Sequence, residues 1–203
     1  MSVATKVRHF TRVLDVNHRE LEQLLDLAVQ LKEEPARYEG ALHGRTIACI
    51  FEKPSTRTRV SFAAAAAELG ATPIALSPQD LQLGRGESLA DTARSLSGYC
   101  AAIVVRTFAQ ETVDELAAWA TVPVVNALSD EHHPCQALAD LLTIREERGE
   151  LPGKRLAYQH VGCPGLAHLG SSHVSLSIFP ESAGRSRFKS AEVRSRKCPS
   201  TVS

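Results

Sequence analysis

The sequence lacks the apolar segments that export or membrane insertion requires. Its first ten residues, MSVATKVRHF, contain no apolar core of a signal peptide, and no later run approaches the length of a membrane span. It also lacks a charge bias, because 23 lysines and arginines balance 23 aspartates and glutamates. Such a balance indicates no general surface for nucleic acid or membrane. The sequence therefore predicts a cytoplasmic protein with neither of these as a partner.

Cysteine is sparse, with five residues in a chain of 203 and no CxxC pair. An odd number of widely spaced cysteines argues against a disulfide framework or a zinc knuckle and favours a reducing compartment. Residues 160–173 contain three histidines and a cysteine, but their spacing fits no standard zinc motif. We therefore predict no metal site.

Short apolar runs alternate with helix-like segments along most of the chain. The expected strands are Thr46–Phe51, Thr72–Leu76, 101–106 and 122–125. The expected helices are one capped by Asn17 and ended by Pro35, and those at 56–69, 88–97, 112–120 and 134–149. This alternation indicates parallel strands joined by right-handed crossovers, with helices on both faces. The predicted fold is an α/β domain with an open parallel sheet, spanning residues 1–150.

The stretch after the first expected strand, residues 51–62, reads FEKPSTRTRVSF. Its donors are three hydroxyls and two guanidiniums, those of Ser55, Thr56, Thr58, Arg57 and Arg59. A helix start offers unpaired N–H groups and the positive end of the helix dipole, and arginines add bidentate bonds to an anion. The stretch therefore predicts a phosphate site. A helix capped by Ser or Thr with solvated arginines is the structural alternative.

Polar side chains follow each expected strand. They are Ser55, Thr56, Arg57 and Thr58 after the first, Gln82 after the second, Arg106 at the end of the third, and Asn126, His132, His133 and Gln136 after the fourth. Ligands of open parallel sheets bind outside the carboxyl ends of the strands. Few carboxylates lie among these residues, so we predict a small, strongly anionic substrate with a polar carbonyl. Separately, Arg106 is also explained by solvent contact and His133 by helix capping.

Several motifs follow one another in unbroken order over residues 5–158. They are FEKPSTRTR, Gln82 with Gly84, Glu87 and Ser88, Arg106, and the run His133, Pro134, Cys135 and Gln136. In this combination they resemble the aspartate and ornithine carbamoyltransferase family. Lys53 before the proline resembles the ornithine enzymes more than the aspartate enzymes.

The resemblance implies a role for each residue at this edge. It implies that carbamoyl phosphate is bound by Ser55, Thr56, Arg57, Thr58, Gln82, Arg106, His133 and Gln136. Arg106, His133 and Thr58 would be catalytic and face the carbamoyl oxygen, and Gln136 would bind the carbamoyl amine. The implied reaction carbamoylates the δ-amine of L-ornithine, giving citrulline and phosphate in arginine biosynthesis. The family also implies a homotrimer, with Gln82 near the subunit interface, and no metal or organic cofactor.

The chain departs from the family pattern in two places. Ala63 replaces a usual glutamate, which removes a partner for Arg59. From residue 159 onward the resemblance stops, and 159–203 holds ten serines, six basic residues and two acidic residues. Such a composition buries little apolar surface. We expect a carbamoyl-phosphate-binding domain at 1–150, the start of a link at 151–158, and a disordered or frame-shifted tail at 159–203 in place of a second domain.

Three functions remain open from the sequence. The first is ornithine carbamoyltransferase activity. The second is carbamoyl-phosphate binding without turnover, because the family's ornithine motifs, Ser-Met-Gly and His-Cys-Leu-Pro, are missing from the sequence. The third is transfer to another amine acceptor. The missing motifs favour an inactive chain.

Overall fold

The computed structural model describes residues 7–81 and 86–152. The predictions for Gln82, for residues 153–158 of the link and for the tail at 159–203 therefore lie outside the described residues. The chain divides after Leu142 into two compact units. Within the described ranges, no helix is long and apolar enough to cross a membrane.

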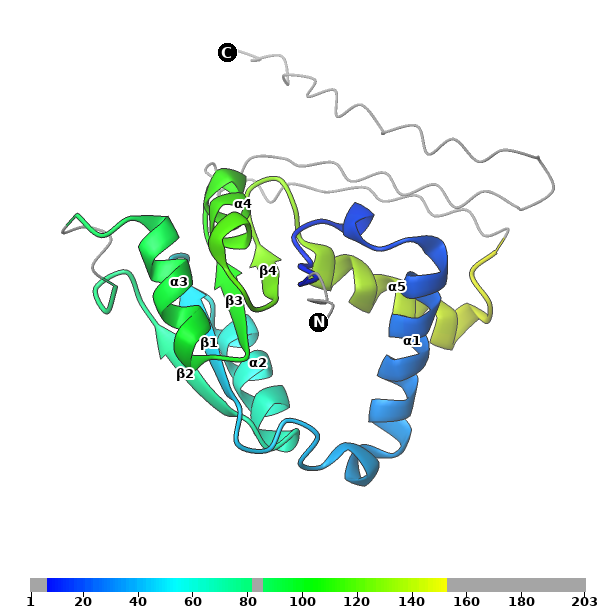
Figure 1. The fold of residues 1–203 in the computed structure, drawn as a ribbon. Coiled ribbons are helices and arrows are strands. Elements are labelled where there is room, and N and C mark those ends of the chain that lie inside the picture. Colours follow the sequence, from blue (N-terminus) through cyan, green and yellow to red (C-terminus); the bar gives the residue numbers. More distant parts are fainter. Residues whose placement is uncertain (1–6, 82–85, 153–203) are drawn as a thin grey trace, which may run out of the picture. The chain divides into compact units, whose positions relative to one another are not determined.

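The first unit is built on a parallel sheet of four strands (Figure 1). The strands are β1 (Thr46–Phe51), β2 (Thr72–Leu76), β3 (Ala102–Arg106) and β4 (Val124–Leu128). Their order in the sheet is β2-β1-β3-β4. The bounds of β1 and β2 are those predicted, and β3 begins one residue later than expected.

Five α-helices and two short 3-10 helices accompany the strands in the described ranges. They are η1 (Val13–Asp15), α1 (His18–Glu33), η2 (Pro35–Tyr38), α2 (Thr56–Glu68), α3 (Leu89–Tyr99), α4 (Gln110–Trp119) and α5 (Pro134–Arg148). Asn17 and Glu20 form the predicted capping box at the start of α1. Gly70 ends α2 with a φ of 84°, and a Cβ at this position would lie 2.9 Å from the Cα of Gly40. A glycine is therefore required at this turn.

The alternation of side chains along β1 divides the core between the two faces of the sheet. Ala48 and Ile50 belong to the cluster that packs under α3 and α4. Ile47, Cys49 and Phe51 belong to the opposite cluster, with side chains from α2. Helices therefore cover both faces, as predicted for an open α/β sheet (Figure 1).

The prediction for the fourth strand was wrong in its position. β4 runs to Leu128, so Asn126 lies inside the strand and not after its end. The amino-terminal segment explains the difference, because Phe10 N donates to Val124 O at 2.8 Å and Asn126 N donates to Phe10 O at 2.9 Å. The Asn126 side chain is itself satisfied by Thr11 O at 3.0 Å. A polar side chain can occupy the buried strand because its hydrogen bonds are made there.

The described part of the second unit is short. It contains the end of α5, where Gly149 has a φ of 74° and its N–H donates to Arg145 O at 2.9 Å. Arg145 also pairs with Glu150 at 3.9 Å. These contacts form an ordinary glycine-ended helix terminus.

Candidate functional site

The candidate site lies where β1 and β3 run side by side. The helix that follows β1 lies on one face of the sheet, and the helix that follows β3 lies on the other. Their chains therefore diverge at the carboxyl edge and leave the crevice in which open α/β sheets bind ligands. The predicted residues Ser55 to Thr58 follow β1, and Arg106 is the last residue of β3.

The start of α2 is a helix terminus suited to an anion. Ser55 caps it, because its Oγ accepts a hydrogen bond from Thr58 N at 3.3 Å. The first turn of α2 contains no acidic side chain, so nothing in this turn opposes the positive end of the dipole. Arg57 is exposed there, and no described carboxylate forms an ion pair with it. The Ser/Thr cap and the anion site are therefore compatible features of one helix start.

Arg106 joins the end of β3 to this helix. Its Nη1 donates to Thr58 Oγ1 at 3.2 Å. Its Nε is buried and has no hydrogen-bond partner among the described residues. Burial also lowers the pKa of Arg106, although an arginine remains charged at neutral pH. A half-buried cation with an unused donor is suited to a ligand oxygen.

His133 lies directly before α5 and is held by its own helix. Its Nδ1 accepts a hydrogen bond from Gln136 N at 3.3 Å, which assigns the proton of the neutral imidazole to Nε2. Burial lowers the pKa of His133, the charge of Arg106 lowers it further, and Asp140 opposes both. The imidazole is therefore neutral at pH 7 and offers Nε2–H as a donor. The His133 side chain can therefore cap α5 through Nδ1 and donate a hydrogen bond to a ligand through Nε2.

Gln136 is oriented by the next turn of α5. Its Nε2 donates to Asp140 Oδ1 at 2.8 Å. Its Oε1 is thereby left as an acceptor, which is the group that an amine ligand requires. The neighbouring Cys135 is different, because burial raises the pKa of its thiol to about 11 and its Sγ lies 3.4 Å from Asn126 O. Cys135 is therefore not an activated nucleophile.

The structure thus brings part of the predicted set together. Thr58 and Arg106 are in contact, and Arg106 lies close enough to His133 to shift its pKa. Thr56 and Gln136 lie in the first turns of the same two helices, α2 and α5. Asn126 lies apart from this group, since its side chain is buried in hydrogen bonds to protein groups.

Contacts between the loops at this edge were not predicted from the sequence. Lys53 forms an ion pair with Asp130 and lies 4.7 Å from the centroid of the Phe108 ring. Thr107 Oγ1 donates to Glu52, whose own N–H donates to Arg106 O at 2.9 Å. These contacts connect the residues after β1, β3 and β4. The only signal in the sequence was the presence of charged residues directly after strand ends.

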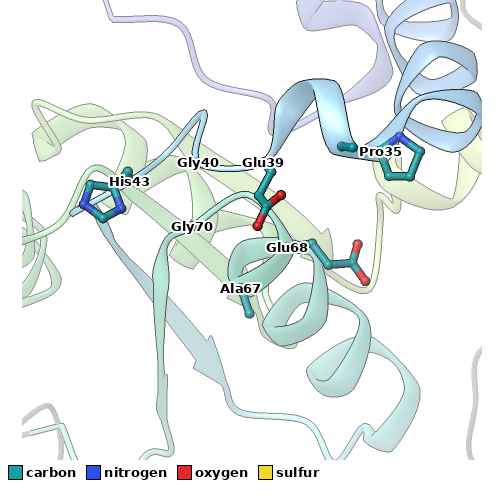
Figure 2. A pocket seen from close by; sticks show the side chains of 8 residues that line it. Pro35, Glu39, Gly40, His43, Ala67, Glu68 and Gly70 are labelled. Carbon is teal, nitrogen blue, oxygen red and sulfur yellow. The ribbon is translucent and has the colours of Figure 1, made fainter.

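A cavity of about 440 Å³ lies elsewhere, beside η2 and the end of α2 (Figure 2). Its walls include Glu39, Glu68 and His43, and Gly40 and Gly70 lie beside them. These residues come shortly before β1 or β2, so the cavity lies at the amino edge of the sheet. Two carboxylates and the negative end of the α2 dipole disfavour an anion there. This cavity is not the predicted phosphate site.

Comparison with known proteins identifies the family of this chain. The profile of the family described as "Aspartate/ornithine carbamoyltransferase, carbamoyl-P binding domain" matches residues 8–146. The chain belongs to this family. An ornithine carbamoyltransferase of Parafrankia sp. is 60% identical over 156 residues, which cover 74% of this chain and 49% of the relative. Another, of Anoxybacillus flavithermus, is 54% identical over 159 residues, covering 77% and 51%.

Solved structures of the family show the same fold. The ornithine carbamoyltransferase from Pyrococcus furiosus superposes with a TM-score of 0.70 at 46% identity, covering 76% of this chain and 50% of that one. The enzyme from Thermus thermophilus gives 0.68 at 44% identity, covering 73% and 52%. The chain spans about half the length of the relatives that it matches.

We expect the imidazole of His133 to titrate below pH 6.5, the usual value for histidine, because burial and the Arg106 charge lower its pKa. Asp140→Asn should lower this pKa further, since the Asp140 charge raises it. The unfolded chain then binds more protons than the folded chain just below pH 6.5, so this group makes stability fall as the pH falls through that range.

An NMR pH titration of His133 tests both shifts. Asp91→Asn serves as the matched control, because Asp91 is a carboxylate on α3 that pairs with Arg94. It should leave the His133 titration unchanged. A pKa of His133 at or above 6.5 in the unaltered protein would contradict the lowering of this pKa by burial and by the Arg106 charge.

Proposed function

We propose that the chain binds carbamoyl phosphate and is the corresponding half of an ornithine carbamoyltransferase. The backbone and hydroxyl donors of Ser55, Thr56 and Thr58 take the phosphate, together with the Arg57 guanidinium. The carbamoyl oxygen accepts hydrogen bonds from Arg106, His133 and Thr58. This is a proposal for residues 1–150, which act as the carbamoyl-phosphate-binding domain.

One observation carries the proposal. Arg106, at the end of β3, donates to Thr58 at the start of α2 and retains a buried donor without a partner among the described residues. The contact places the Arg106 cation beside the start of α2, which suits a phosphate. From there the cation can bind a further oxygen of the same ligand. Neutral His133, within reach of the Arg106 charge, supplies a further donor. An oxyanion stabilised by donors held in place is the main catalytic requirement of acyl transfer.

The proposed reaction is attack of the neutral δ-amine of ornithine on the carbamoyl carbon. A tetrahedral intermediate forms with its negative charge on the former carbonyl oxygen. Its collapse breaks the carbon–oxygen bond to phosphate and, after loss of a proton from the amine nitrogen, leaves citrulline. Gln136 Oε1, oriented by the bond from Nε2 to Asp140, accepts a hydrogen bond from the carbamoyl amine. The rest of the rate enhancement comes from holding both substrates in a fixed geometry.

We also propose an acceptor, an assembly and a cellular location for the protein. The relatives named above are ornithine carbamoyltransferases, which supports ornithine over another amine acceptor. We propose the homotrimer and the place in arginine biosynthesis that the family resemblance implies. The three described cysteines are unpaired, which supports a reducing, cytoplasmic setting.

Calorimetry with carbamoyl phosphate and with inorganic phosphate tests the binding proposal. We expect carbamoyl phosphate to bind at least about tenfold more tightly, because one or two net hydrogen bonds to the carbamoyl group contribute about 1.4 kcal/mol. Equal affinities would show a phosphate site without recognition of the carbamoyl group and would contradict the proposal.

Citrulline formation by the 203-residue chain, with ornithine and carbamoyl phosphate both present, separates the remaining alternatives. Carbamoyl-phosphate binding with citrulline production supports the full transferase. Binding without citrulline supports the binding domain without turnover. Consumption of carbamoyl phosphate with a different amine supports another acceptor.

A further inference from the structure

A buried polar network lies beneath the turn that leads to His133. Its members are Thr11, Gln110, Asn126 and Ser129, each at most 5% exposed. Burying polar side chains is costly unless their hydrogen bonds are made. Thr11, Gln110 and Ser129 were not predicted at the ligand edge, and Asn126, which was, makes its hydrogen bonds to protein groups instead. Their role therefore depends on the neighbouring groups to which they form hydrogen bonds.

Gln110 is oriented from outside the network. Its Nε2 donates to Asp114 Oδ1 at 3.0 Å, and Asp114 Oδ2 accepts from Arg12 Nη2 at 2.6 Å. The amide oxygen of Gln110 is therefore turned inward. There it accepts from Ser129 Oγ at 2.5 Å and from Asn126 Nδ2 at 3.2 Å. The side-chain amide of Gln110 thus supplies a donor to the carboxylate and an acceptor to the two interior groups.

Ser129 connects Gln110 to the backbone of His132, the residue before His133. Its Oγ accepts from His132 N at 3.0 Å, and its N–H donates to His132 O at 2.8 Å. Asn126 Nδ2 lies 3.4 Å from the same carbonyl oxygen. Both backbone groups of His132 are thus bound to the network. The next residue is His133, whose imidazole already has Nδ1 committed to Gln136 N.

We propose that Gln110 is a positioning residue for His133, acting through Ser129 and Asn126 on the His132 backbone. It fixes the direction of Nε2–H without touching the ligand. The identity of the ligand that Nε2–H meets rests on the proposed function, whereas the positioning itself does not. The Arg12–Asp114 ion pair lies outside the network and contributes by orienting the Gln110 amide.

The test uses Gln110→Met in the full chain, because methionine has a similar length but neither donor nor acceptor of comparable strength. Thr92→Val is the matched control: Thr92 is also a buried polar helix residue, 2% exposed, and its Oγ1 has no hydrogen-bond partner among the described residues. The ¹⁵N shifts of the His133 imidazole report tautomer and environment in the ligand-free protein. Calorimetry then gives the affinities for carbamoyl phosphate and inorganic phosphate.

We expect Gln110→Met to change the His133 shifts toward mixed tautomers and to reduce the preference for carbamoyl phosphate over phosphate about tenfold. Its affinity for phosphate alone should change less than about twofold, because the start of α2 is not part of the network. Thr92→Val should leave all three quantities unchanged. If Gln110→Met does not fold, Ser129→Ala removes the same connection and should give the same changes.

Unchanged His133 shifts in a folded Gln110→Met or Ser129→Ala variant would overturn the proposal. So would equal losses of phosphate and carbamoyl-phosphate affinity, because these indicate a general structural effect. Failure of the proposed function gives a different result: the unaltered chain would show no preference for carbamoyl phosphate, while the His133 shifts would still respond to Gln110→Met.

Discussion

Arg106→Met is expected to weaken carbamoyl-phosphate binding about 100-fold, while phosphate binding falls less. Arg106 offers a free buried Nε and the Nη1 that now contacts Thr58. Two charge-assisted bonds to a ligand oxygen, at a net of about 1.5 kcal/mol each, correspond to a loss of this size. The pKa of His133 should rise in the same variant, because the Arg106 charge lowers it.

The same substitution should leave the folded state as stable as before or more stable, by about 1 kcal/mol. Arg106 keeps its charge in a half-buried place with a polar atom that has no partner among the described residues, and methionine removes that cost. A thermal melt measured beside the calorimetry therefore separates lost binding from lost folding. Loss of affinity together with a lower melting temperature would contradict this account.

Arg94→Met is the matched control for Arg106→Met. Arg94 also pairs with a neighbouring group, Asp91 at 2.9 Å, and its guanidinium lies 4.2 Å from the centroid of the Trp119 ring. It belongs to the middle of α3 and not to the carboxyl edge of the sheet. Its replacement should leave ligand affinity and the His133 pKa unchanged.

Much of the fold was predictable because its signals are local. The bounds of β1 and β2 follow from apolar runs, and Asn17 with Glu20 marks the start of α1 by a capping box. Convergence of the loops at one edge follows from parallel strands, because all their carboxyl ends share that edge. The contact between Arg106 and Thr58 is a direct consequence of this topology.

What could not be predicted depends on partners far apart in the sequence. Asn126 interrupts an apolar run, so the strand was expected to end at residue 125, before its observed end at Leu128. Only the contact with Thr11, 115 residues earlier, shows why the strand continues. Lys53 and Asp130 are separated by 77 residues, so their pairing has no local signal either. In the sequence, Gln110 looks like an ordinary polar residue before a helix. Its burial cannot be seen there, because it arises only where three elements of the fold meet.

The second large effect is expected for Arg57→Ala, which should abolish measurable phosphate binding and weaken carbamoyl phosphate at least 100-fold. Arg57 is exposed in the first turn of α2 and has no ion pair with a described carboxylate, so its guanidinium is available to a ligand. A bidentate bond to phosphate is worth about 3 kcal/mol or more in this setting. Calorimetry with both ligands measures the loss.

Two further variants make the Arg57 result specific. Arg57→Lys keeps the charge but loses the planar pair of donors, so its affinity should lie between those of the alanine variant and the unaltered chain. Arg59→Ala removes the other guanidinium of the motif, which lies 5.1 Å from the centroid of the Phe51 ring. Because that group already has a partner in the protein, its loss should affect binding less than the loss of Arg57.

Unfolding does not explain the expected loss in Arg57→Ala. Alanine has a higher helix propensity than arginine, and a cation in the first turn is unfavourable beside the positive end of the dipole. The variant should therefore be at least as stable as the unaltered chain. If it were stable and still bound carbamoyl phosphate with unchanged affinity, the phosphate would have to lie away from the start of α2. The roles assigned to Ser55, Thr56 and Thr58 would then be wrong as well, because all of them depend on the same helix terminus.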